Sequence, residues 1–154
     1  MPRFELRPFA MSEAERVAAW AATPGDVRRI AAENLFPLSP ADIASWIVES
    51  NFAFTLRCDG DLVAYGDLVE DEVAGDIEVG HLLVAPDMRR SGMGQALLSR
   101  LCAFAAASRP YKEIWFRVTR DNEPAAGCAT AIGFVDDDDM SGPRFRWMKK
   151  NLRE

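Results

Sequence analysis

Residues 84–94 read Val-Ala-Pro-Asp-Met-Arg-Arg-Ser-Gly-Met-Gly, and this stretch joins a strand-like run to a helix-like run. Before it, residues 77–84 (IEVGHLLV) have the apolar and β-branched content of a buried strand. After it, leucines and a phenylalanine recur at helical spacing over residues 97–104, so we expect a helix to begin near Gly92. The segment therefore predicts a strand, a turn and a helix in succession.

The turn has the composition of a phosphate-binding loop. The first N–H groups of a helix lack intrahelical partners and carry the positive end of its dipole, which favours an anion. Gly92 and Gly94 remove side chains that would hold a phosphate away, and Arg89 and Arg90 supply guanidinium donors. Gln95 replaces the lysine of a Walker loop, and a dinucleotide fingerprint would need a third glycine. An ordinary turn with solvated arginines would share this composition.

A second strand and helix follow farther along the chain. Residues 114–119 (IWFRVT) read as a strand. Asn122 is a good N-cap and Gly133 a good C-cap for the helix between them. A capped helix alone would explain both residues. Whether they also indicate a function depends on their order and separation relative to the first turn.

Together the two segments resemble the GNAT superfamily of N-acetyltransferases. Residues 89–94 match its pyrophosphate motif, which is Arg or Gln, two free positions, Gly, one free position, and Gly or Ala. Asn122, Ala125 and the pair Gly133-Phe134 fall at the spacing of its closing motif. The resemblance implies an α/β fold with a central, mostly antiparallel mixed sheet, whose fourth and fifth strands splay apart and whose faces are flanked by helices.

The remaining patterns fit that element order. Ser12 is expected to cap the first helix with Glu15 in the capping-box position, and Asp59-Gly60 signals a hairpin. The expected strands are 6–9, 52–58, 62–69, 77–84, 114–119, 134–135 and 144–148, and the expected helices are 12–22, 27–33, one opened by Ser39-Pro40, and those following Gly92 and Asn122.

Length and composition predict one domain over residues 1–154. A chain of 154 residues with 49% hydrophobic residues buries roughly two-thirds of its unfolded surface. No apolar run approaches membrane-spanning length and the first ten residues do not resemble a signal peptide, so we expect a cytoplasmic protein without membrane contact. Three dispersed cysteines favour reduced thiols over a disulfide framework or a metal site.

The net charge of −6 argues against nucleic-acid binding. The acidic surface would favour cationic acceptors approaching a mouth of the site away from Arg89 and Arg90. The acidic run at residues 136–139 is expected to be a solvated loop extended by charge repulsion, in preference to a substrate-steering element.

The resemblance further implies acetyl-CoA as co-substrate and no metal. The pyrophosphate would lie on the turn, the pantetheine arm would pair with the fourth strand, and a backbone N–H of that strand would face the thioester carbonyl. The residues implied in cofactor binding are Leu82, Leu83, Val84, Arg89, Arg90, Ser91, Gly92, Met93, Gly94, Gln95, Asn122 and Ala125.

Direct attack by an amine in a ternary complex requires a base, because an alkylamine is mostly protonated at neutral pH. Glu78 stands where several family members place a catalytic glutamate, and His81, the only histidine, lies on the same strand. Strict alternation sends them to opposite faces, and a bulge would change that parity. We favour Glu78 over His81. The structural alternatives are a Glu78–Arg117 ion pair and a buried, satisfied imidazole.

One position departs from the family pattern. Many members carry a tyrosine seven positions after the asparagine, where it protonates the departing thiolate, and this chain has Ala129. Water, Ser91 or Tyr111 would then supply the proton, or the protein has lost catalysis and is a coenzyme A-binding regulatory module.

The acceptor stays open between a small-molecule amine and a peptide N-terminus or lysine, on a monomer or homodimer. Residues 35–37 and Trp46 are candidates to contact the acceptor, although aromatic residues there are more often core.

Overall fold

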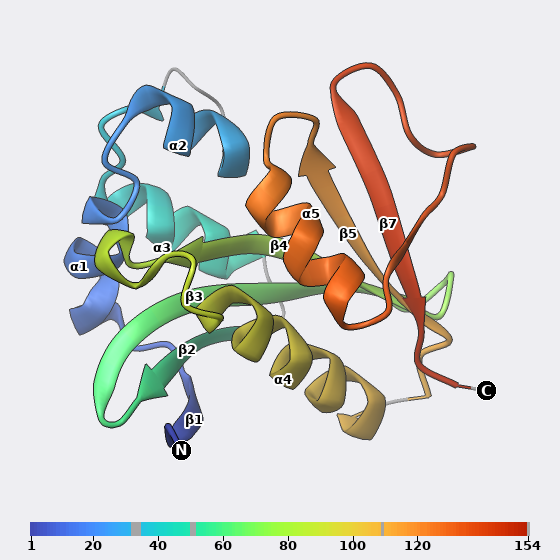
Figure 1. The fold of residues 1–154 in the computed structure, drawn as a ribbon, viewed down its shortest axis with the longest axis horizontal. Coiled ribbons are helices and arrows are strands. Elements are labelled where there is room, and N and C mark those ends of the chain that lie inside the picture. Colours follow the sequence, from blue (N-terminus) through green and yellow to red (C-terminus); the bar gives the residue numbers. More distant parts are fainter. Residues whose placement is uncertain (32–34, 50–51, 109, 154) are drawn as a thin grey trace.

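The computed structural model describes residues 1–31, 35–49, 52–108 and 110–153. A seven-stranded sheet of order β1-β2-β3-β4-β5-β7-β6 forms its centre (Figure 1). The strands are β1 (Phe4–Pro8), β2 (Phe52–Cys58), β3 (Asp61–Asp71), β4 (Asp76–Val84), β5 (Glu113–Thr119), β6 (Val135–Asp136) and β7 (Phe145–Asn151). Every neighbouring pair is antiparallel except β4 with β5. The predicted mixed, mostly antiparallel sheet is confirmed.

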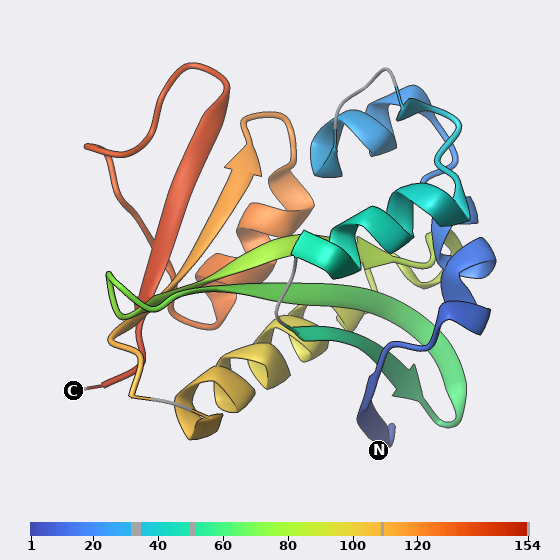
Figure 2. The ribbon, with the colours of Figure 1, turned by 180° about the vertical axis from the view of Figure 1, so that it is seen from behind.

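Helices cover both faces of this sheet. They are α1 (Ala14–Ala19), α2 (Pro24–Ile30), α3 (Pro40–Glu49), α4 (Met93–Ser108) and α5 (Glu123–Ala131), with short 3-10 turns η1 (Met11–Glu13) and η3 (Pro86–Met88). Helices α4 and α5 lie against one face, and α1, α2 and α3 lie on the other, as the opposite views in Figures 1 and 2 show. In the described part of the chain, no helix is long and apolar enough to cross a membrane.

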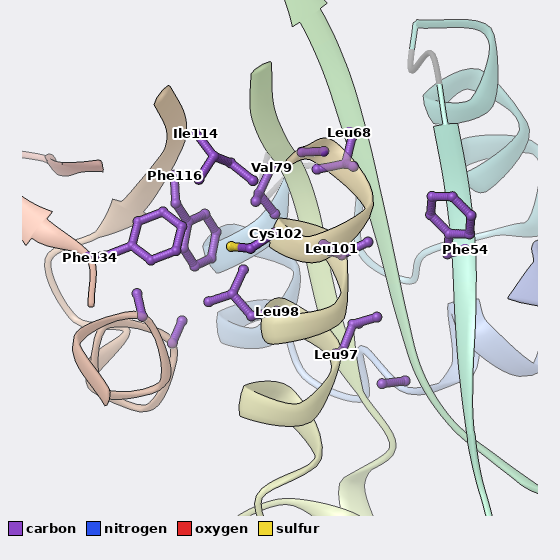
Figure 3. Packing of buried hydrophobic residues seen from close by; sticks show 14 of the residues in the cluster. Phe54, Leu68, Val79, Leu97, Leu98, Leu101, Cys102, Ile114, Phe116 and Phe134 are labelled. Carbon is purple, nitrogen blue, oxygen red and sulfur yellow. The ribbon is translucent and has the colours of Figure 1, made fainter. Parts of the chain in front are cut away.

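Each face of the sheet has its own apolar core. On one side, the helical stripe of Leu97, Leu98 and Leu101 on α4 packs against the strands, and Phe134 closes the cluster beside β5 (Figure 3). On the other side, a second cluster gathers residues of α1, α2 and α3 around Tyr65. The burial of the α4 leucines is complete, as their spacing predicted.

Strands β4 and β5 pair over only part of their lengths. The parallel pairing joins Asp76–Val79 to Glu113–Phe116, and both strands continue beyond it without pairing to each other. The sheet therefore opens between them, as the family resemblance implied.

A bulge interrupts β4 where this opening begins. Asp67 pairs with His81 and the next residue, Leu68, pairs with Val79, so Gly80 is the extra residue. A Cβ atom at Gly80 would lie 2.4 Å from Oδ1 of Asp67. Glycine is therefore required where the bulge approaches the Asp67 carboxylate.

The first helix begins differently from the prediction. Glu13, not Glu15, reaches back, and its Oε1 accepts the backbone N–H of Ala10 at 2.9 Å. This contact starts a 3-10 turn before Ser12, so Ser12 lies inside the turn and is not a cap. Helix α1 follows directly and ends at Ala19, three residues before the predicted end.

The next two helices begin at residues with capping side chains. Thr23 accepts the N–H of Asp26, so α2 starts before the predicted range, whose end at Glu33 lies outside the described residues. Ser39 and Asp42 exchange hydrogen bonds at 2.9 and 3.2 Å, which confirms the start of the third helix at Ser39-Pro40.

The acidic run at residues 136–139 is partly paired. Arg146 donates two hydrogen bonds of 3.0 Å to Asp136, and Lys149 lies 3.1 Å from Asp137. Both contacts hold the pKa of these carboxyls below the ordinary value. The expectation of a loop extended by repulsion is wrong for this half of the run, because the neighbouring basic strand β7 neutralises it.

Candidate active site

Two pockets adjoin where β4 and β5 separate. The first, of about 650 Å³, lies between the end of β4, the 89–95 turn and α5, and we call it the turn groove. The second, of about 450 Å³, lies between residues 78–82, residues 116–119, the end of α2 and residues 144–145, and we call it the arginine pocket. Arg29, Ile30, Leu82 and Asn122 line both pockets, so a ligand in one would lie beside a ligand in the other.

The turn groove brings together nearly all of the residues expected to hold a cofactor. Ser91 is the exception, since its hydroxyl donates to the carbonyl of Met88 and it does not line the groove. The expected residues that do line it are Leu82, Leu83, Val84, Arg89, Arg90, Gly92, Met93, Gly94, Gln95, Asn122 and Ala125.

The two glycines of the turn have different roles. Gly92 has φ of +84°, a left-handed conformation that favours glycine, and an added Cβ would have no described atom within 4 Å. A Cβ on Gly94 would instead lie 3.2 Å from Sγ of Cys128. Gly92 therefore shapes the turn and leaves open space in front of it, whereas Gly94 permits α4 to approach α5.

Arg89 and Arg90 also differ. The Arg89 guanidinium donates to the carbonyls of Trp20 and Val84 at 2.8 and 3.2 Å and lies 3.4 Å from the carboxylate of Asp26. Arg89 therefore ties the turn to the segment between α1 and α2. Arg90 lines the groove and, in the described part of the chain, has no hydrogen bond or ion pair through its side chain.

Asn122 and Gly133 cap α5 as the sequence indicated. Oδ1 of Asn122 accepts the N–H of Ala125 at 3.4 Å, and Gly133 has φ of +105° beyond the helix end. Between them, Ala129 is completely buried in the main core, and its neighbour Cys128 lines the groove. Burial raises the pKa of the Cys128 thiol.

The other hydroxyls considered as proton donors do not reach the groove. Tyr111 is buried, and its hydroxyl donates to Glu70. Ser91 points back to the turn, as described above. Neither residue lines either pocket.

Glu78 and His81 both line the arginine pocket, because the bulge at Gly80 changes the alternation between them. Burial raises the pKa of Glu78, and the charges of Arg117 and His81 partly oppose this rise. Within the described residues, no ion pair joins Glu78 to Arg117, whose guanidinium lies 4.5 Å from the centre of the Phe145 ring. The pocket thus contains a carboxylate that is a stronger base than an exposed glutamate.

His81 is held by two neighbours. Its Nδ1 lies 2.9 Å from Oδ2 of the completely buried Asp67, and Trp46 stacks on the imidazole with ring centres 3.9 Å apart. The Tyr65 hydroxyl donates to Asp67 at 2.6 Å, and burial raises the pKa of Tyr65, so it keeps its proton. An ionised carboxylate only accepts hydrogen bonds, so Nδ1 carries the ring proton and the lone pair of a neutral imidazole lies on Nε2.

Sequence reasoning missed two residues that shape this site: Asp67, which contacts His81, and Gly80, which lines the pocket. Asp67 is a lone carboxylate in the apolar run 62–69, and Gly80 is a glycine within a strand; both were available as signals. The pairing of Asp67 with His81 depends on the register across the bulge, which no local pattern specifies.

The predicted acceptor-contacting segment is wrong for the described pockets. Trp46 is buried in the second core and packs on His81, and residues 35–37 line neither pocket. Residues 28–30 of α2 and Ala31, which follows the helix, form that wall instead. Trp46 is part of the core, Phe36 is exposed away from both pockets, and arginines line the pocket. Among the residues described, no group of three or more His, Cys, Asp or Glu side chains could hold a metal ion.

Solved structures with similar folds include N-acetyltransferases and a member of an acetyltransferase family. Spermidine N-acetyltransferase from Vibrio cholerae, in complex with CoA and spermine, has a TM-score of 0.76 at 14% identity, covering 97% of this chain and 95% of that one. Ribosomal-protein-S18-alanine N-acetyltransferase from Escherichia coli has a TM-score of 0.69 at 21% identity, covering 99% and 96%. An acetyltransferase of the GNAT family from Streptococcus pneumoniae has a TM-score of 0.73 at 14% identity, covering 97% and 99%.

The TM-scores establish a shared fold, and at identities of 14–21% the likeness extends no further than the fold. The search of curated proteins found no match. The sequence model of the Acetyltransferase (GNAT) family matches residues 14–134, which include both strand-turn-helix segments and most of the chain. The chain therefore belongs to the GNAT family of acetyltransferases.

Proposed function

We propose that this protein transfers an acetyl group from acetyl-CoA to a primary amine, by direct attack in a ternary complex. The observation that carries the proposal is the junction of the two pockets at Leu82 and Asn122. A groove with free N–H donors and arginines on one side meets a pocket with a buried carboxylate on the other. Both substrates would then bind together, one in each pocket.

The turn groove suits the coenzyme. Its pyrophosphate would lie at the N-terminus of α4, beside Arg90 and the open space at Gly92. The pantetheine arm would lie along residues 82–84, because β4 has no strand paired to its β5 side beyond Val79. Such an unpaired edge binds an extended amide chain as a sheet binds an added strand.

Glu78 is the base that we assign to the reaction. Its carboxylate would take a proton from the acceptor ammonium, directly or through water, and the neutral amine would attack the thioester carbonyl carbon. A C–N bond forms and the C–S bond breaks. A backbone N–H within residues 82–84 would stabilise the oxyanion. His81, with its lone pair on Nε2, is the second candidate for the base.

A free cysteine thiol has a pKa of about 8.5, and a thiolate of this kind departs without a strong general acid. Water would carry to it the proton that the amine nitrogen loses on acylation, since Ala129 supplies no hydroxyl. The same alanine is the feature that favours the alternative function, a coenzyme A-binding regulatory module.

The test is an acetylation assay with acetyl-CoA and a broad panel of amines, in which free thiol and acetylated product are both measured. We expect the two products in equal amounts. Tight binding of acetyl-CoA without turnover of any amine at any pH would instead support the regulatory module. Absence of acetyl-CoA binding would contradict both functions.

A further inference from the structure

The arginine pocket has the opposite charge to the protein as a whole. The chain carries a net charge of −6, yet four arginines line this pocket. They are Arg28, Arg29, Arg117 and Arg144. The acidic side chain in the lining is Glu78, which we assign to the acceptor amine.

The four arginines fall into two pairs. Arg28 and Arg29 lie 3.1 and 3.6 Å from the carboxylate of Asp121, so their charges are partly neutralised. Arg117 and Arg144 have no carboxylate within 4 Å among the residues that the structure describes. Their guanidinium carbons lie 4.5 and 5.4 Å from the centre of the same Phe145 ring. The Phe145 ring thus contacts two guanidinium groups that, within the described residues, form no ion pair, at one end of the pocket.

Arg117 lies a short distance along the sheet from the base. Glu78 is opposite Trp115 in the parallel pairing of β4 with β5. Arg117 comes two residues later on the same face of β5, which is about 6.6 Å farther along the strand. A small molecule can therefore span Glu78 and Arg117, and Arg144 lines the same pocket beside Phe145.

We propose that the acceptor is a small primary amine that also carries a carboxylate, such as an amino acid. The inference rests on the proposed function and names its substrate class. The amine lies at Glu78, and the carboxylate accepts charge-assisted hydrogen bonds from Arg117 and Arg144. The pocket volume of about 450 Å³ is in the range of small-molecule sites. A diamine places its second ammonium group against the same two cations and is rejected.

This substrate class differs from the cationic acceptors expected from net charge. The reason is that a pocket with low-dielectric walls responds to the charges lining it more than to the distant surface. The carboxylates of the surface are screened over about 8 Å at physiological salt.

Matched amines provide the test. γ-Aminobutyrate, butylamine and putrescine share one carbon skeleton and end in a carboxylate, a methyl and an ammonium group, and alanine and isopropylamine form a second matched set. We expect kcat/KM to be about ten- to a hundred-fold higher for the carboxylate member of a set than for its partners. Equal or better acetylation of the neutral and dicationic partners would overturn the inference while leaving the proposed function intact.

Binding provides a readout that does not depend on turnover. Calorimetry with the same amines and the protein saturated with coenzyme A should give tighter binding of the carboxylate members, weakened by added salt. If no amine is acetylated, the proposed function fails, and the calorimetric comparison alone then decides whether the pocket prefers amines that carry a carboxylate. Carboxylates that bind no more tightly than their partners would then overturn it.

Arg144→Gln is the sharpest variant, because Arg144 is not among the charges acting on the pKa of Glu78. We expect it to lower kcat/KM for the preferred carboxylate amine about ten-fold more than it lowers that for butylamine. Arg117→Gln should act in the same direction. Arg16→Gln, on the exposed surface of α1, is the matched control and should change neither value. A loss that is equal for carboxylate and neutral amines in Arg144→Gln would contradict the assignment.

Discussion

Glu78 combines two properties that oppose each other. A general base must be ionised, yet burial disfavours its ionised form and raises its pKa. The folded protein therefore holds this proton more tightly than the unfolded chain does. The stability that this proton contributes is complete below the ordinary pKa of 4.5 and is lost as pH rises through the raised value. At neutral pH the ionised side chain serves catalysis and lowers the free energy of unfolding.

We predict that Glu78→Gln separates these two effects. The acetylation rate should fall on the order of a hundred-fold or more, because glutamine keeps the shape and accepts no proton, while acetyl-CoA affinity changes little. The melting temperature at pH 7 should rise relative to wild type, and the difference should shrink at pH 4. Rate assays and melting curves at both pH values check this. A variant with near wild-type rate would move the base to His81.

Asp67 shows what sequence reasoning leaves out at this scale. The family resemblance pointed to Glu78, His81 was considered because it lies on the same strand, and a bulge was named as the feature that would bring them to one face. The buried carboxylate that orients His81 comes from the neighbouring strand, in a register shifted by Gly80. Register across a bulge follows from tertiary packing on both faces of the sheet, so a single sequence does not specify it.

At the scale of elements, the sequence predicted those helices and strands whose ends carry strong local signals. Asn122, Ser39 and Gly133 lie at helix ends as expected, and the Asp59-Gly60 turn joins β2 to β3. The first helix was misplaced because Glu13 competed with Ser12 for the start of the turn. A helix start capped by Ser12 and one held by Glu13 differ little in free energy. Tertiary contacts contribute more than this difference, so the local pattern does not choose between the two starts.

Helix α5 offers a steric test of the turn groove. Gly127 lines the groove in the middle of this helix, and a Cβ there would have no described atom within 4 Å. Gly127→Leu should therefore fit without strain and raise stability by roughly 0.5 to 1 kcal/mol, because glycine is a poor helix former. The same side chain would project into the groove. We predict that acetyl-CoA affinity falls at least about ten-fold, measured by calorimetry beside a melting curve.

Gly127→Ala is the control for that variant. It should give a similar gain in stability and leave most of the affinity, since one methyl group occupies little of a groove of about 650 Å³. Gly92 is less suitable as a probe, because its φ of +84° strains any side chain. If Gly127→Leu binds acetyl-CoA as well as Gly127→Ala does, the coenzyme does not lie along this side of α5.

At the scale of the whole molecule, the two cores lie on opposite faces of the sheet, and the proposed substrates would enter between layers. The cofactor side is built by α4 and α5, and the acceptor side by α2 and the ends of β5 and β7. The family resemblance implied the residues of the proposed cofactor side, whereas the residues that it suggested for the acceptor, 35–37 and Trp46, line neither pocket. It did not predict the charge of the acceptor side, which depends on arginines from three separate segments that only the fold brings together.

Arg89 connects the two sides, since it bonds the turn at Val84 and the opposite layer at Trp20 and Asp26. We predict that Arg89→Gln lowers stability by about 1 to 2 kcal/mol, a fall of roughly 3 to 6 °C in Tm, and weakens acetyl-CoA binding as well. Hydrogen exchange should rise in both α2 and the turn, because the variant removes their shared tether. Arg90→Gln is the matched control: its side chain lines the groove without such bonds, so it should weaken binding and leave Tm unchanged. If both variants weaken binding with Tm and exchange unaltered, Arg89 acts only as a phosphate ligand, and the layers are held together without it.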